Sequence, residues 1–290
     1  MTPYDIYYFW DSVDGKETPP YIDLCLKTWA RNAKDGRVVR VCSENIGELT
    51  NDVLTKETLA LFTPAQRSDA AIPIVMKNRK GFFWDADTVL LPSFDSSEYL
   101  GQSLPTMYAA MANNRLSPLL AFFANPGGDQ RFLESWGRII LEKIAREKKS
   151  PYRRARRLFR SLKGKTVHVR FDYLGAEVLD NLALDPKEAT NIRTIDVEES
   201  GFCPGASQLD YSPQSYLHHW FGGDVSCVDP SYADGIVALQ NSWIPEKIKN
   251  LSPDQIVCQN NRFGELFRIA EQSVPRVGCG CGLGCLQLFI

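Results

Sequence analysis

Residues 80–94, KGFFWDADTVLLPSF, place two aspartates one residue apart between two apolar runs. The apolar runs predict a buried strand at residues 82–91 that carries Asp85 and Asp87, here called the acid pair. Burial of either carboxylate is costly, and two like charges at this spacing repel each other. We therefore expect a positive centre between them, which could be a metal ion, a metal-bound phosphate or a phosphoryl group in covalent chemistry.

Ahead of this run, the apolar pattern alternates between the period of a strand and the period of a helix. Strands are predicted at residues 4–10 and 37–43, and helices at residues 18–36, 45–61 and 64–78. This alternation predicts an α/β fold with a mostly parallel sheet that helices cover on both faces. In such sheets ligands bind beyond the carboxyl ends of the strands, where Trp10 and the acid pair are both expected.

The middle of the chain is interpreted as mostly helical, with an amphipathic helix at 129–149 followed by a basic run. Between Glu147 and Asp172 lie ten lysines and arginines and no acidic residue. The run is either a solvated helix face or a surface that attracts anionic lipid headgroups, at about 1 kcal/mol per basic residue. A net charge of -2 and the lack of a recognised binding motif exclude nucleic acid as the expected partner.

The sequence favours a cytoplasmic protein. Its first residues have no basic leader, Asp5 and Asp11 interrupt the first apolar run, and no stretch has the length of a membrane span. The eight cysteines are then expected to be reduced thiols. Three of them, Cys279, Cys281 and Cys285, lie in a Gly/Cys-rich tail that is expected to be weakly ordered rather than a metal site.

Three collinear segments resemble a known enzyme family. They are IYYFWDSVDGKETPPYIDLCLKTWARN at the start, RSDAAIPIVMKNRKGFFWDADTVLLPS in the core and LQNSWIPEKIKNLSPDQIV near the end. Each is similar to a segment of the bacterial capsular-polysaccharide-synthesis and mannosyltransferase-like glycosyltransferases, in which a Ser-Asp precedes a D-x-D pair. Residues 95–230 match that family less clearly.

The resemblance implies a GT-A-like fold and a transfer reaction. A sugar would move from a nucleotide-diphosphate sugar, with UDP-sugar expected first, to a glycan or lipid-linked acceptor, with retention of anomeric configuration. The family pattern implies a Mn²⁺ or Mg²⁺ ion held by Asp85, Asp87 and Asn241, with the acid pair as the catalytic residues. The donor-binding residues that it implies are Trp10, Ser68, Asp69, Ala86, Ser242 and Trp243.

The resemblance also divides the chain into four parts. Residues 1–128 would form the nucleotide-sugar-binding core, and residues 129–175 a helical basic insertion that could contact the membrane. Residues 176–275 would complete the catalytic domain on the acceptor side, and residues 276–290 form the tail.

Some residues depart from the family or allow a structural role. Ile72 stands where the family commonly has arginine, and Lys80-Gly81 replaces a paired glycine. Trp10 could be a core residue, and residues 241–243 could begin a helix. The histidines at 218–219 could pack structurally, form a wall of the acceptor site or offer an imidazole to the metal.

A phosphatase is the competing hypothesis. Residues 85–89, DADTV, also resemble the D-x-D-x-[TV] signature of the haloacid-dehalogenase superfamily, in which the first aspartate is a nucleophile. Gly223, Asp224 and Asp229 resemble that superfamily's later acidic motif. Against this hypothesis, that motif should follow an apolar strand, which LHHWFG is not, and 84 residues precede Asp85.

Overall fold

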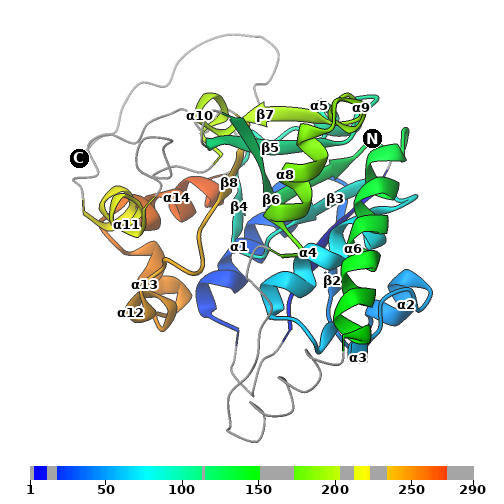
Figure 1. Ribbon diagram of the computed structural model, residues 1–290. Helices are drawn as coiled ribbons and strands as arrows, with labels where there is room; N and C mark the ends of the chain where they lie inside the picture. The colour runs from blue at the N-terminus through cyan, green and yellow to red at the C-terminus, as the bar shows by residue number, and fades with distance from the viewer. Residues whose placement is uncertain are drawn as a thin grey trace, which may run out of the picture.

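A mixed six-stranded sheet forms the centre of the computed structural model, which describes residues 3–11, 18–112, 115–150, 173–202, 212–222 and 234–272 (Figure 1). The strand order is β2–β1–β3–β6–β5–β7. The strands are β1 Tyr4–Phe9, β2 Gly36–Val41, β3 Gly81–Trp84, β5 Thr106–Ala112, β6 Arg115–Asn125 and β7 Arg193–Asp196. Because β6 alone pairs antiparallel with both neighbours, the other strands of the sheet share one direction. The prediction of a mostly parallel α/β sheet is confirmed.

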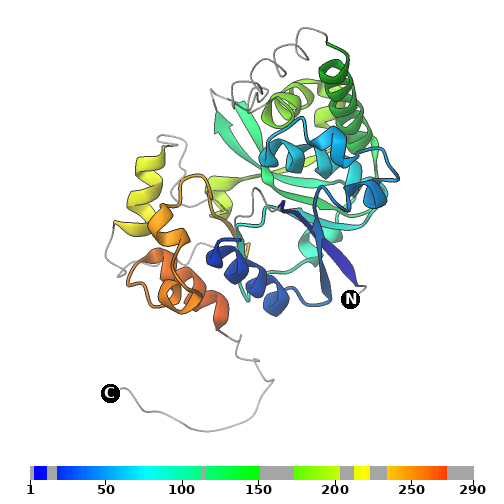
Figure 2. The same ribbon diagram turned by 90° about the horizontal axis from the view of Figure 1, so that it is seen from below.

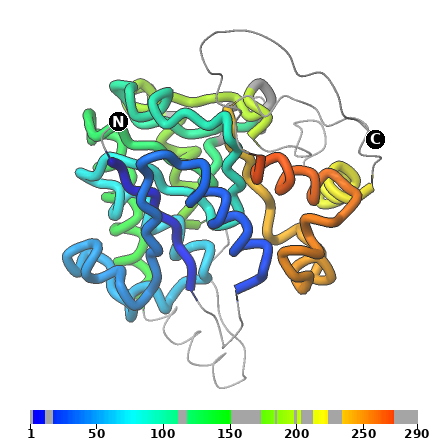
Figure 3. The backbone as a smooth tube through the Cα atoms, turned by 180° about the vertical axis from the view of Figure 1, so that it is seen from behind, coloured from blue at the N-terminus to red at the C-terminus, as the bar shows by residue number. Residues whose placement is uncertain are grey.

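Helices cover both faces of this sheet, as predicted (Figures 1 and 3). The alternation of β1 explains this: Tyr4, Ile6 and Tyr8 pack in one core cluster, and Tyr7 and Phe9 pack in the other. The first cluster includes residues of α1 (Pro20–Asn32) and α14 (Arg262–Glu271). The second includes residues of α4 (Pro64–Met76), α6 (Arg131–Lys149) and α8 (Ala176–Leu184).

Shorter helices complete the described part of the chain. Their bounds are α2 Ile46–Thr50, α3 Lys56–Leu59, α5 Ser97–Leu100, α9 Pro186–Ala189, α10 Val197–Ser200, α11 Pro213–Phe221, α12 Glu246–Lys249 and α13 Pro253–Val257. Helices α11 to α14 gather at one side of the molecule, next to α1 (Figure 2). Among the described residues, no helix combines the length and the apolar character that a membrane crossing needs.

The single strand predicted at residues 82–91 is wrong, because the chain forms two strands there. β3 pairs with β1 and β6 in the large sheet, whereas β4 (Thr88–Leu90) pairs antiparallel with β8 (Ile236–Ala238) in a second sheet. A turn separates them, in which Thr88 N donates to Asp85 O at 3.1 Å. Each apolar run is buried against a different partner, and the turn between the two strands carries the acid pair.

One other expectation needs correction, and one pair of strands was not predicted. The helix predicted at residues 45–61 is divided into α2 and α3, because Asn51 and Asp52 adopt positive φ angles of 50° and 60° that end α2. Residues 106–125, for which the sequence predicted no particular element, form the antiparallel pair β5–β6. There the pairing with neighbouring strands outweighs the helix propensity of the alanine, leucine and methionine residues.

Candidate active site

The acid pair lies beyond the carboxyl end of β3, between the two sheets. Asp85 belongs to the large sheet, since its backbone N donates to Ala121 O of β6 at 3.0 Å. Asp87 belongs to the small sheet, since its backbone O accepts from Leu239 N at 3.0 Å. The Asp87 side chain is 8% exposed, and its Oδ2 accepts a hydrogen bond of 2.7 Å from Asn241 N. The predicted position at a strand's carboxyl end is confirmed.

Asp69 of α4 is close enough to Asp85 to affect its charge. A methyl group built on Gly175, just before α8, would lie 2.4 Å from Asp69 Oδ2 and 2.7 Å from Leu120 Cδ1. Leu120 directly precedes Ala121, whose carbonyl accepts the hydrogen bond from Asp85 N. The negative charge of Asp69 contributes to raising the pKa of Asp85, so the fold brings the predicted residues Asp69, Asp85 and Asp87 into one electrostatic neighbourhood.

Burial disfavours the charged form of all three carboxyl groups, and for Asp85 repulsion by the other two adds to it. Burial raises the pKa of Asp69 to about 8. Burial, together with the charges of Asp87 and Asp69, raises the pKa of Asp85 well above its ordinary value. Burial also raises the pKa of Asp87, against the opposing effect of the Asn241 hydrogen bond. Within the described residues, no donor forms a hydrogen bond with the half-buried carboxylates of Asp69 or Asp85.

These open carboxylates suit a divalent cation, because hard oxygen ligands bind Mg²⁺ and Mn²⁺ and a cation would relieve the repulsion. Across the part of the chain that the structure describes, no three Asp, Glu, His or Cys side chains gather as a metal-binding group. A neutral oxygen remains available in Asn241 Oδ1, which accepts a hydrogen bond from the hydroxyl of Tyr21.

The remaining predicted donor-binding residues differ in their burial. Trp10 follows β1, is half-buried and packs against the first core cluster. Ser68 and Ala86 are buried, so Ala86 could meet a ligand only through its backbone. Ser242 is exposed in the turn after Asn241, and Trp243 packs edge-on against Tyr216 with ring centroids 5.5 Å apart. The suggestion that residues 241–243 begin a helix is wrong, because α12 begins at Glu246.

The structure also places three other residues that the sequence singled out. His219 of α11 lies with Nδ1 3.0 Å from an Nη atom of Arg262 on α14, which agrees with the structural role. Ile72 is fully buried in the second core cluster. Lys148, in the basic run, donates to Thr58 Oγ1 at 2.6 Å. The motifs that lie outside the described residues are the run at 153–170, Gly223, Asp224, Asp229 and the cysteines at 279, 281 and 285.

A network that the sequence did not predict joins the ends of β1 and β2 to α4. Asp11 accepts hydrogen bonds from Ser43 N at 2.7 Å and Ser43 Oγ at 2.6 Å, and it forms an ion pair of 2.7 Å with Arg67. Arg67 Nε also donates to the carbonyls of Leu59 and Phe62. Arg67 has no local signal in the sequence, because its partner lies 56 residues away. The network fixes the helix that carries Asp69 against the strand ends.

We expect Asp11→Asn to lower the free energy of unfolding by about 2–3 kcal/mol at neutral pH, because it leaves Arg67 without its anion. Burial alone would raise the pKa of Asp11, but the Ser43 hydrogen bonds and Arg67 outweigh it and lower that pKa. A lowered carboxyl pKa stabilises the fold above the unfolded value of about 3.9, and the stabilisation is lost as the pH falls below it.

Urea unfolding of both proteins between about pH 6 and pH 3 checks this expectation. The difference between wild type and Asp11→Asn should shrink on acidification. A difference that stays constant over this range would show that the ionised carboxylate is not its source.

A groove of about 890 Å³ lies elsewhere, between α2, α4 and α6. Its apolar lining includes Leu49, Val53, Ile74, Leu133 and Leu141. None of the predicted site residues lines it, so it is separate from the acid pair.

Comparisons with known proteins give structural matches. No family model matches the sequence, and no curated protein sequence matches it. One similar solved structure is the PaToxG glycosyltransferase, with 13% identity, a TM-score of 0.39 and coverage of 65% of this chain and 73% of that one. Another is the apo form of the glycosyltransferase GlyE of Streptococcus pneumoniae, with 13% identity and a TM-score of 0.44. That match covers 94% of this chain and 61% of the GlyE chain.

Proposed function

We propose that the protein is a metal-dependent glycosyltransferase that moves a sugar from a nucleotide-diphosphate sugar to a glycan or lipid-linked acceptor. The observation that carries the proposal is the pair of carboxylates at the carboxyl end of β3, with the open Asp85 close to the charges of Asp87 and Asp69. This edge of a mostly parallel sheet is where α/β proteins bind nucleotides. A divalent cation bound there would favour the charged form of these carboxyl groups, which burial and repulsion otherwise disfavour.

The roles of the residues follow from their chemistry. Asp85, Asp87 and Asn241 Oδ1 would hold Mn²⁺ or Mg²⁺. Bound there, the ion would supply positive charge that stabilises the nucleotide diphosphate as it leaves the anomeric carbon. Asp69, whose carboxylate is half-buried, would accept hydrogen bonds from hydroxyl groups of the ribose or the donor sugar.

The other predicted residues would bind the rest of the donor. Trp10, half-buried at the end of β1, offers a ring face for the base. Ser242 and Trp243, in the turn beyond Asn241, would contact the diphosphate. Together with Ser68 and the backbone of Ala86, they complete the donor site that the family resemblance implies.

The finer features of the proposal rest on the same resemblance. They are a UDP-sugar donor, retention of configuration and a place in capsular or surface polysaccharide synthesis. The four-part division of the chain stays part of the proposal, with the acceptor side in the C-terminal part. The basic run from Lys148 would lie against anionic lipid on the cytoplasmic side of the membrane, near a lipid-linked acceptor.

A thermal-shift screen of UDP, GDP and their sugars, with and without Mn²⁺, tests the function. A nucleotide diphosphate near 100 times its dissociation constant should stabilise the protein by about 2.7 kcal/mol, which raises the melting temperature by about 5 °C, and only when Mn²⁺ is present. UMP at the same concentration is the control. No nucleotide effect, together with hydrolysis of simple phosphomonoesters, would instead support the phosphatase with Asp85 as nucleophile.

A further inference from the structure

Tyr21 connects the start of α1 to the acid pair through Asn241. Its side chain is fully buried, and its hydroxyl donates a hydrogen bond to Asn241 Oδ1 across 220 residues of sequence. Its ring packs at a tilt against Phe263 of α14, with centroids 6.3 Å apart. Burial and the charge of Asp87 raise the pKa of Tyr21, so its hydroxyl keeps the proton that it donates.

Asn241 in turn contacts Asp87. The Asn241 backbone N donates to Asp87 Oδ2 at 2.7 Å, while its carboxamide oxygen accepts from Tyr21. A carboxamide can rotate by half a turn and exchange its oxygen for its NH₂ group, which repels a cation. While the hydroxyl donates to Oδ1, the oxygen faces Tyr21, and one lone pair of that oxygen remains for a second partner.

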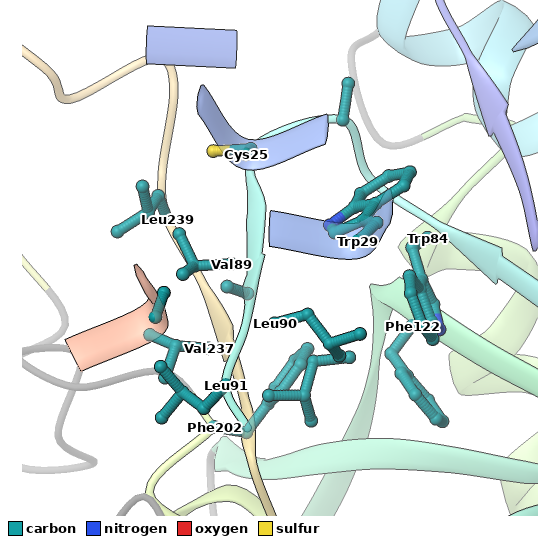
Figure 4. Packing of buried hydrophobic residues seen from close by; sticks show 14 of the residues in the cluster. Cys25, Trp29, Trp84, Val89, Leu90, Leu91, Phe122, Phe202, Val237 and Leu239 are labelled. Carbon is teal, nitrogen blue, oxygen red and sulfur yellow. The ribbon is translucent and has the colours of Figure 1, made fainter. Parts of the chain in front are cut away.

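The helix that carries Tyr21 is fixed to the strand that follows Asp87. Trp29 Nε1 donates to Thr88 O at 2.7 Å, and Asn32 Nδ2 donates to Leu90 O at 2.7 Å. Leu90 N donates to Thr28 Oγ1 at 2.9 Å. Figure 4 shows Cys25 and Trp29 of α1 beside Val89 and Leu90, with Val237 and Leu239 on the far side of that strand. Helix α1 and β4 therefore hold Tyr21 and Asp87 in a constant relation.

We propose that Tyr21 is a positioning residue for the divalent cation, because its hydroxyl holds the carboxamide oxygen of Asn241, whose backbone N binds Asp87. The proposal rests on the metal site of the proposed function and adds a residue that does not touch the ion. Hydrogen-bond partners that orient a metal ligand typically change metal affinity by 10- to 100-fold when they are removed.

Titration of Mn²⁺ alone, followed by the EPR signal of the free ion, tests the proposal. Tyr21→Phe keeps the ring and removes the hydroxyl, so we expect about 10-fold weaker Mn²⁺ binding. The matched control is Tyr99→Phe, because Tyr99 is also buried and its hydroxyl lies 2.7 Å from that of Tyr108, in a hydrogen bond that involves neither Asn241 nor Asp87. Tyr99→Phe should bind Mn²⁺ as the wild type does, although each variant loses a buried hydrogen bond and some thermal stability.

A third variant separates this proposal from the proposed function. Asp87→Asn should lose Mn²⁺ binding, and if it binds as the wild type does, the metal site itself is wrong. If Asp87→Asn loses Mn²⁺ while Tyr21→Phe keeps the wild-type affinity, the metal site stands and the role of Tyr21 is overturned. Equal weakening in Tyr21→Phe and Tyr99→Phe would also overturn it, since the loss would then reflect general destabilisation.

Discussion

Exchange of Asp87 for asparagine is expected to lower donor turnover by about 10³-fold or more and to abolish Mn²⁺-dependent nucleotide binding. Asparagine keeps an oxygen that can accept the hydrogen bond from Asn241 N, so the local backbone should stay in place. What is lost is the negative charge that attracts the cation. Turnover of the donor found in the nucleotide screen, and calorimetric titration with its nucleotide diphosphate and Mn²⁺, measure both effects.

The same exchange should have the opposite effect on the stability of the metal-free protein. Burial raises the pKa of Asp87, which means that its charged form is costly in the folded state at neutral pH. Removal of that charge should raise the free energy of unfolding by about 1 kcal/mol. The control is Asp254→Asn, at an exposed site in α13, which should change neither property. Full metal-dependent activity in Asp87→Asn would contradict the metal assignment.

Substitution of Gly81 by alanine is expected to destabilise the fold by at least about 3 kcal/mol. Gly81 has a φ angle of 148°, and a methyl group there would lie 2.2 Å from the carbonyl oxygen of Asp5. Asp5 is its partner in the parallel pairing of β1 with β3. Because the clashing oxygen belongs to the backbone of β1, the clash is relieved only if the two central strands move apart.

Urea unfolding measures this loss, with Gly137→Ala as the matched control. Gly137 lies within α6, where alanine favours the helix by about 1 kcal/mol. Its added methyl group would meet only the end of the Ile74 side chain, at 3.0 Å. The control should therefore stay within about 1 kcal/mol of wild type. If Gly81→Ala changed the free energy of unfolding as little as the control does, β1 and β3 would not have the register described.

Periodicity and end signals predicted much of the fold. Strands β1 and β2 are rich in aromatic and β-branched residues, and α4 begins with Pro64 after a Thr63–Gln66 capping box. The division between β3 and β4 could not be predicted, because apolar residues continue on both sides of the acid pair and local pattern does not specify a sheet partner. The pair β5–β6 was missed for a similar reason, since antiparallel pairing between distant residues decides it.

Part of the candidate site could also be predicted from the sequence, and part could not. Asp69, Asp85 and Asp87 were marked by their spacing and by the family resemblance, and the fold brings their charges together. The contact between Asn241 and Asp87 joins residues 154 positions apart and uses a backbone donor, so no side-chain pattern in the sequence predicts it. Tyr21 and Gly175 carry no signal either, because their importance lies in the atoms that fold against them.

The turn at Asp85–Asp87 joins two sheets, and this has a consequence for how the acidic residues are spaced. Asp85 is held to β6 through its backbone N, and the carboxylate of Asp87 is held to the segment after β8. Their separation therefore depends on the angle between two independently paired layers and not on the pleat of a single strand. Any rotation of the small β4–β8 ribbon, with the C-terminal helices beside it, opens or closes the gap that an ion would bridge.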